Sequence, residues 1–270
     1  DFKYGVNVNL SHNENEVTRI ANSEGIIHGA ENILSNASAE MYRAQENFPI
    51  GYFYGFHTAG VFQNDEQIKN YTGAKLANTR PGDLIFVDSD HNGTIDEKDK
   101  GMIGDPHPDF NLGFSLNLSY KGFDLSATAA GAFGQQIAKS YRSFADLPNQ
   151  NYTSDIFERW HGDGSSNKLP RLSSTANPNW QYVSDIYIED GDYLKLQNLT
   201  LGYDFKKLFK NMPLQQARIY VSAQNLFTIT GYSGMDPEIG YGSNEGWVSG
   251  IDLGFYPSPR TYLIGVNLKF

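Results

Sequence analysis

An acidic segment carries the clearest chemical signal in the sequence. Oxygen-bearing side chains occupy positions 1, 3, 5, 7, 9 and 12 of the stretch 88–99, and they are Asp88, Asp90, Asn92, Thr94, Asp96 and Asp99. This is the spacing of a calcium loop, in which Gly93 permits the turn and Ile95 points inward. Four of these six side chains are carboxylates, which would repel one another without a cation. We therefore predict a structural Ca²⁺ that makes the loop rigid.

An alternative remains open for this segment. Asp99 stands where calcium loops usually carry the longer Glu, so bidentate closure of the site is less assured. A turn rich in Asp and Asn that needs no metal would use the same residues.

Aromatic side chains in the loop-like segments are candidates for sugar binding, because amphipathic rings suit the apolar faces of pyranosides. The candidates are Trp160, Trp180, Tyr182, Tyr241 and Trp247. Each of them could instead pack within the loops or contact a partner protein.

Catalytic chemistry finds no support in the sequence. The six histidines are scattered, and none stands at metal-ligand spacing with another. The chain has no cysteine, so it has neither a thiolate nucleophile nor a disulfide. We predict that it is not an enzyme. The formal net charge of −10, with no basic tract, also argues against a nucleic-acid partner.

Strands are the elements that position these residues. Apolar and small polar residues alternate over 2–11, 110–120, 123–129, 217–230 and 261–270, so each strand has one apolar and one polar face. Lys121 and Gly122 predict a tight turn. The stretch 193–205 predicts a strand with a β-bulge near Gln197 and Asn198, where the apolar phase shifts. The aromatic stretch 52–62 predicts another strand with poorer alternation.

Two-faced strands and an aromatic final residue are typical of an outer-membrane β-barrel, in which lipid wets one face and a polar lumen the other. Aromatic residues near the strand ends are then predicted to form the girdle at the membrane interface, and they are Tyr120, Tyr203, Phe205, Tyr262 and Phe270. Their competing role is the core of a soluble sandwich. No stretch approaches the roughly 18 apolar residues of a helical span.

The lengths of the connections predict their side of the membrane. Long connections at 63–108, 137–190 and 231–260 alternate with short ones, and outer-membrane barrels place long loops outside the cell. This assignment makes 13–50 an unusually long periplasmic connection, for which the sequence offers no explanation. About seven strands cannot close a barrel, so we expect the remaining strands to be supplied elsewhere.

Specific strings resemble the SusC family of TonB-dependent outer-membrane transporters. They are RWHGDG at 159–164, YIEDGDYLKLQNLTLGY at 187–203, ARIYVSAQNLFT at 217–228, MDPE at 235–238 and YPSPRTY at 256–262. Their order and spacing match the C-terminal part of that family from about residue 51 onward, and more loosely before it.

The resemblance implies an all-β fold, a transmembrane antiparallel β-barrel of 22 strands with a plug, of which residues 1–270 would be the C-terminal portion with about seven strands. It also implies a surface lipoprotein of the SusD type as a lid, TonB acting on the plug, and a place in the bacterial outer membrane. The implied activity is import of oligosaccharides, with short peptides as the alternative cargo. The rival interpretation is a soluble secreted β-sandwich binding module stabilised by calcium.

Overall fold

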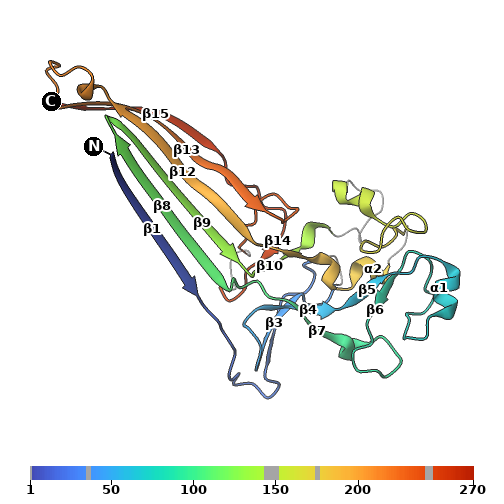
Figure 1. Ribbon diagram of the computed structural model, residues 1–270. Coiled ribbons are helices and arrows are strands. Elements are labelled where there is room, and N and C mark those ends of the chain that lie inside the picture. Colours follow the sequence, from blue (N-terminus) through green and yellow to red (C-terminus); the bar gives the residue numbers. More distant parts are fainter. Residues whose placement is uncertain (1, 35–37, 143–151, 174–176, 241–245) are drawn as a thin grey trace.

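The longest strands form one antiparallel sheet (Figure 1). The computed structural model describes residues 2–34, 38–142, 152–173, 177–240 and 246–270. The sheet has the order β1-β8-β9-β12-β13-β15. Its strands are β1 (Phe2–His12), β8 (Phe110–Tyr120), β9 (Phe123–Phe133), β12 (Tyr193–Asp204), β13 (Gln216–Thr230) and β15 (Thr261–Lys269). Each has at least 9 residues, which is the length that a tilted strand needs to cross a bilayer.

The strand register keeps the apolar rows in phase across the whole sheet. Leu116 on β8 pairs with Val6 on β1 and with Ala127 on β9. Because side chains alternate between faces, this pairing places every apolar row of the sheet on one side. That side is exposed, and Ile264 on β15 is 77% accessible. A soluble sandwich would cover this face with a second layer, and the described residues supply none.

Two local predictions are confirmed. The register of β12 shifts between Leu196 and Asn198 against both of its neighbours, which is the predicted bulge. Lys121 and Gly122 join β8 to β9, and both have positive φ, as a tight two-residue hairpin turn requires.

The predicted strand at 52–62 is not part of this sheet. It forms two short strands in separate small sheets, β4 (Tyr52–Phe56) and β5 (Thr58–Val61). Successive residues such as Tyr52 and Phe53 are both buried, so the stretch lacks the exposed face of a barrel strand. The described sheet therefore has six strands and not about seven.

This difference changes the side on which residues 13–50 lie. β1 pairs directly with β8, and His12 lies opposite Phe110, so one connection of residues 13–109 joins the two strands. Phe133 also lies opposite Phe110, and Tyr193 lies opposite Thr230. The connections 13–109, 134–192 and 231–260 consequently leave the same end of the sheet. The prediction that 13–50 crosses the other end is wrong, and the predicted loop 63–108 is the second half of the longer connection.

These three connections pack together into what we call the loop domain, at the end of the sheet away from the chain termini (Figure 1). Three small sheets order it: β2-β3-β4-β7, β5-β6 and β11-β10-β14. Their remaining strands are β2 (Ile26–His28), β3 (Tyr42–Gln45), β6 (Leu84–Phe86), β7 (Lys100–Gly104), β10 (Gln136–Lys139), β11 (Ile188–Asp190) and β14 (Ile251–Asp252). All three connections contribute to one core, represented by Phe53, Trp180 and Ile251.

Helical segments in the described residues are short. They are α1 (Asp65–Asn70), α2 (Pro178–Gln181), η1 (Glu97–Asp99), η2 (Ser140–Arg142), η3 (Ser154–Glu158), η4 (Asp185–Tyr187) and η5 (Phe205–Lys207). Asn64 caps α1 by accepting the backbone N–H of Gln67 at 2.9 Å. No helix in the described part of the chain has the length and apolar character needed to cross a bilayer.

Opposite faces of one strand provide a direct test of this architecture. Leu116→Arg should lower the free energy of unfolding of the complete membrane protein by about 2–4 kcal/mol, because the cation would enter the apolar layer. Asn117→Arg, one residue along β8 and on the other face, should cost less than about 1 kcal/mol. Denaturant titration in lipid vesicles measures both, and equal losses would contradict the assignment of the faces.

Candidate functional site

A ladder of neutral hydrogen-bonding groups lies on the polar face of the six-stranded sheet. Its members include Asn7, Ser115, Asn117, Ser126, Thr128, Asn198, Thr200 and Ser222. Asn7 Nδ2 donates to Ser115 Oγ at 3.2 Å, and the hydroxyls of Thr200 and Ser222 lie 2.8 Å apart. Hydroxyls and amides both donate and accept, so this face suits water or a neutral polar ligand.

A pair of opposite charges, Arg218 and Asp124, lies on this face near the turn at Lys121 and Gly122. Arg218 Nε donates to Asp124 Oδ1 at 2.9 Å, and the guanidinium also lies over the Tyr220 ring. Gly202 makes room for it, because a Cβ there would lie 2.6 Å from Arg218 Nε. The sequence analysis did not identify this pair, although a carboxylate and a guanidinium at polar-face positions of strands were its signal.

Buried lysines fasten the loop domain, and the sequence analysis missed them too. Lys195 on β12 is 3% exposed, and its Nζ bonds to Glu238 and lies 3.4 Å from Asp236 Oδ2. Asp236 also accepts the backbone N–H of Ser258 at 3.1 Å. The segment 231–260 is thereby attached to the sheet. The sequence signal was weak, because a lysine between two leucines also fits the polar face of a two-faced strand.

A second lysine joins two of the connections to each other. Lys139 on β10 is buried, and its Nζ donates to Asp155 Oδ2 and to Ser233 Oγ, each at 2.8 Å. Ser233 in turn donates to Glu189 at 2.9 Å. A buried ammonium group is stable only where its partners are held in place, so this cluster holds the two connections together.

The four predicted sugar-binding aromatics that the structure describes lie in the loop domain, but they are not gathered around one cavity. Trp180 is 1% exposed, and its Nε1 donates to the Arg171 carbonyl at 2.9 Å, so it is a core residue. Trp160 donates to Gln63 Oε1 at 3.2 Å and packs at the edge of the core.

The other aromatics also have neighbouring rings. Tyr182 stacks on Phe56 with ring centroids 5.3 Å apart, and Trp247 packs edge-on against Tyr42 at 5.2 Å. Tyr182 keeps a partly exposed ring. Tyr241 lies outside the described residues. Packing within the loops, the alternative interpretation, therefore accounts for Trp180 and for most of the surface of Trp160, Tyr182 and Trp247.

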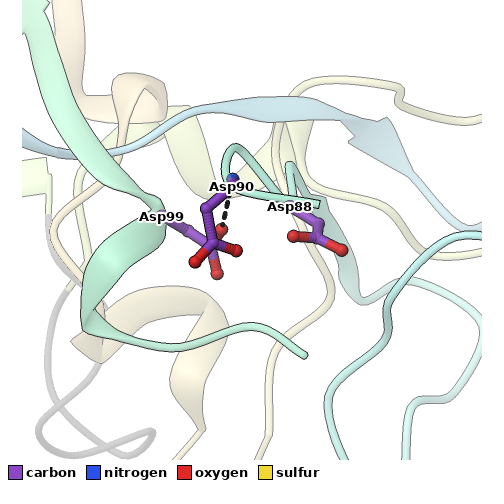
Figure 2. Close-up of side chains that lie close together, drawn as sticks. All are labelled: Asp88, Asp90 and Asp99. Carbon is purple, nitrogen blue, oxygen red and sulfur yellow. Dashed lines mark hydrogen bonds between the residues drawn. The ribbon is translucent and has the colours of Figure 1, made fainter. Parts of the chain in front are cut away.

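The acidic segment 88–99 folds into a compact loop before β7. Oxygen atoms of Asp88, Asp90 and Asp99 all lie within 4.8 Å of one another, and Figure 2 shows their carboxylates close together. Asp99 is buried, and its oxygens accept the backbone N–H groups of Ser89 and Asp96 at 2.7 and 2.8 Å. Carboxylates that converge in this way are the donor set that Ca²⁺ prefers.

The remaining predicted ligands, Asn92, Thr94 and Asp96, are linked to one another and to Asp90 by hydrogen bonds. Asn92 Nδ2 donates to Asp90 at 3.0 Å and lies 3.4 Å from Asp96, while Asn92 Oδ1 accepts from the Thr94 hydroxyl at 2.5 Å. The backbone N–H of Lys98 donates to Asp96 at 2.8 Å and lowers the pKa of this exposed carboxyl. Asp96 is therefore ionised at neutral pH. The structure thus brings Asp88, Asp90 and Asp99 of the predicted set together, and it connects Asn92, Thr94 and Asp96 to them through hydrogen bonds. The metal itself stays a prediction.

The predicted girdle residues divide between two ends of the apolar face. Tyr120, Tyr203 and Phe205 lie at the end with the short turns, where the rings of Tyr203 and Phe205 are 5.1 Å apart. Phe270 is exposed at that same end. Tyr262 lies towards the loop domain, opposite Ala223. Their contact with lipid stays a prediction.

Comparisons with known proteins identify relatives over the whole chain. No protein-family model matches. The chain is similar to the TonB-dependent receptor P3 of Formosa agariphila, with 32% identity covering 100% of this chain and 27% of that protein. It is also similar to the TonB-dependent receptor SusC of Bacteroides thetaiotaomicron, with 28% identity covering 100% of this chain and 25% of that protein. The chain thus spans about a quarter of the length of these relatives.

Solved structures show the same correspondence. The RagAB peptide transporter aligns with a TM-score of 0.72 and 22% identity over 100% of this chain and 27% of that chain. The RagAB peptide importer in its closed-closed state aligns with a TM-score of 0.71 and 22% identity, over 100% of this chain and 28% of that chain. At this level of identity, the likeness shows that the fold is shared.

The Lys195 cluster gives a test of how the loop domain is fastened. Lys195→Met should leave the carboxylates of Asp236 and Glu238 without their cation and weaken the attachment of 231–260 by about 3 kcal/mol. Hydrogen exchange of the complete protein should show faster exchange in that segment. Lys269→Met, at the exposed end of β15, serves as the control and should leave exchange in 231–260 unchanged. Unaltered protection in the Lys195 variant would show that the cluster does not hold the loop.

Proposed function

Because this chain belongs to the SusC-like TonB-dependent receptors of the bacterial outer membrane, we propose that it is the C-terminal part of an outer-membrane importer. The single observation that carries the proposal is the sheet with an uncovered apolar face and a continuous polar face. Lipid would contact the first face and water in the lumen the second. The proposal includes no bond-making step.

The edges of the sheet support a larger barrel. β1 and β15 are the outermost strands, and each has one edge that pairs with no described strand. Unpaired backbone groups in a bilayer cost several kcal/mol each, so these edges need partners. In the proposal, the remaining strands of the same protein pair with these two edges. The rest of that protein would also contribute the plug.

Oligosaccharides are the cargo that we propose. The hydroxyls and amides of the polar face, such as Thr200 and Ser222, match the hydroxyls of a neutral glycan and carry no charge. Short peptides are the second candidate, favoured by the fold that this chain shares with RagAB, whose printed description is a peptide transporter. A charged peptide would meet the fixed charges of this face, which include the Arg218–Asp124 pair and Lys3, opposite Ser119.

The proposed partners follow from the family. A SusD-like surface lipoprotein would cover the barrel over the loop domain, and TonB would act on the plug to open the lumen. The loop domain would then lie on the outside of the cell, because all three long connections leave one end of the sheet.

We propose that Ca²⁺ binds the loop 88–99 and has a structural role. The convergence of Asp88, Asp90 and Asp99 supports the proposal, because three carboxylates whose oxygens lie within 4.8 Å of one another repel unless a cation lies among them. The ion would tie the segment after β6 to the start of β7, so it would stabilise the loop domain rather than take part in transport.

Uptake by the complete receptor tests the importer and its cargo. A strain in which this receptor is the only route should accumulate labelled oligosaccharides when TonB is present and fail when TonB is deleted. Replacing both Thr200 and Ser222 by Ala should weaken apparent affinity about 5–150-fold, because two hydrogen bonds are lost and each is worth about 0.5–1.5 kcal/mol. The control variant replaces Leu201 and Val221, their neighbours on the apolar face, and should not change affinity.

The possible outcomes of this assay separate the proposals. Accumulation of peptides without oligosaccharides would establish the second cargo and reject the first. Accumulation of neither, or uptake that persists without TonB, would reject the importer.

Chelation tests the calcium proposal. Millimolar Ca²⁺, at about 100 times the dissociation constant, should stabilise the loop by about 2.7 kcal/mol, seen as resistance of 88–99 to protease that EDTA removes. Asp88→Asn should abolish the difference between Ca²⁺ and EDTA. Glu97→Gln, at a position of the same loop that is not in the ligand set, should retain it. Identical protease sensitivity with calcium and with chelator would count against a metal.

A further inference from the structure

The two short connections of the sheet lie side by side at the end opposite the loop domain. One is the turn at Lys121 and Gly122, and the other is the segment 205–215, which begins with η5. The backbone N–H of Asp204 donates to the Gly122 carbonyl at 2.8 Å. A Cβ added to Gly122 would lie 3.0 Å from Lys207 Cβ. The two connections therefore form one continuous surface, placed near both chain termini in Figure 1.

Lysines gather on this surface although the chain as a whole is acidic. Lys121, Lys206, Lys207 and Lys210 lie within the two connections, in a chain with a formal net charge of −10. Lys206 Nζ donates to the carbonyls of Lys210 and Met212 at 2.8 and 2.7 Å, so it stabilises the turn itself. The other three side chains are exposed, and we call Lys121, Lys207 and Lys210 the basic rim.

The basic rim has no carboxylate partners within the described residues. The two nearest acids along the chain are already bound. Asp124 pairs with Arg218, and Asp204 Oδ1 accepts the backbone N–H groups of Lys206 and Ala217 at 3.0 and 3.1 Å. The positive charge of the rim is therefore available to an anion from outside the chain.

Apolar side chains surround these lysines. Leu208 is 60% exposed and Phe209 is 55% exposed, in the same segment as Lys207 and Lys210. Lys121 Nζ lies 5.1 Å from the centre of the Tyr120 ring, at the end of the apolar face. Aromatic and aliphatic groups beside extended lysines are the arrangement of a membrane interface, where stems lie against acyl chains and ammonium groups reach the headgroups.

We propose that the basic rim binds the phosphate groups of anionic phospholipids in the leaflet that faces the short turns. The charge of the rim complements a phosphate, and Leu208 and Phe209 provide the apolar contact that a soluble anion would not need. The short turns of outer-membrane barrels face the periplasmic leaflet, so the source is a glycerophospholipid rather than lipopolysaccharide. The inference rests on the membrane-spanning sheet of the proposed function but not on its cargo.

Lipid binding by the complete receptor tests the proposal. The probes are fluorescent phosphatidylglycerol and phosphatidylcholine, titrated into the receptor in zwitterionic nanodiscs. The receptor should prefer phosphatidylglycerol, and Lys121→Gln, Lys207→Gln and Lys210→Gln together should reduce that preference at least tenfold, since each lysine near an anionic surface contributes up to about fivefold. The triple Lys→Arg variant should retain the preference.

A matched variant keeps the total charge equal. Lys69→Gln, Lys75→Gln and Lys98→Gln remove three lysines of the loop domain and should leave phosphatidylglycerol binding unchanged. If the triple rim variant does not fold, judged by its thermal unfolding, the three single variants are measured instead, and each should lose part of the preference.

Other outcomes overturn the proposal. Unchanged phosphatidylglycerol binding in the rim variants would show that the lysines do not contact the lipid. With lipopolysaccharide as a third probe, a loss of binding confined to lipopolysaccharide would show that the rim faces the outer leaflet. Oligosaccharide uptake in the rim variants reports separately on the importer, so failure of one proposal can be distinguished from failure of the other.

Discussion

The described part of the chain leaves one face of its largest sheet without any protein layer, and the rest of the structure depends on this. A sheet that exposed an apolar face of six strands to water would aggregate readily, whereas the same face is stable in contact with lipid. Lipid in turn forbids unpaired backbone groups, so β1 and β15 require neighbours along their free edges. The register answers both demands at once, because it keeps Val6, Leu116 and Ala127 in one row while every interior strand pairs on both sides.

The same pairing explains why a second domain exists at one end. Strands that alternate in direction return each long connection to the same end of the sheet, where three segments meet. These segments share one core, in which Phe53, Trp180 and Ile251 come from three different connections. Packing them together removes large aromatic side chains from water. The loop domain is thus folded by contacts between segments that are distant in the sequence.

The sequence predicts those features of the structure that depend on residues close together in the chain. Alternation, the turn at Lys121–Gly122 and the bulge at Gln197 are local patterns, and the structure has all of them. The core of the loop domain depends on partners far along the chain, so it leaves no period to detect. The aromatic residues of 52–62 suit a strand, so the stretch predicts one more strand of the large sheet. In the structure, Tyr52 and Phe53 are both buried, and the stretch belongs to the loop domain. Counting one extra strand in the sheet assigns the connection 13–50 to the wrong end of it.

The candidate site shows the same limit, and its charges explain how the domain and the sheet keep one arrangement. The predicted ligand set of 88–99 can be found from the sequence because its members are close together in the chain, whereas the partners of Lys195 lie more than 40 residues away. A buried ion pair adds less stability than an apolar contact of the same size, but a buried lysine without its carboxylates is strongly unfavourable. A packing of 231–260 that does not bring Asp236, Glu238 and Ser233 to Lys195 and Lys139 would leave these buried charges without these partners and is therefore unfavourable. Apolar contacts drive the loops together, and the lysines select which arrangement results.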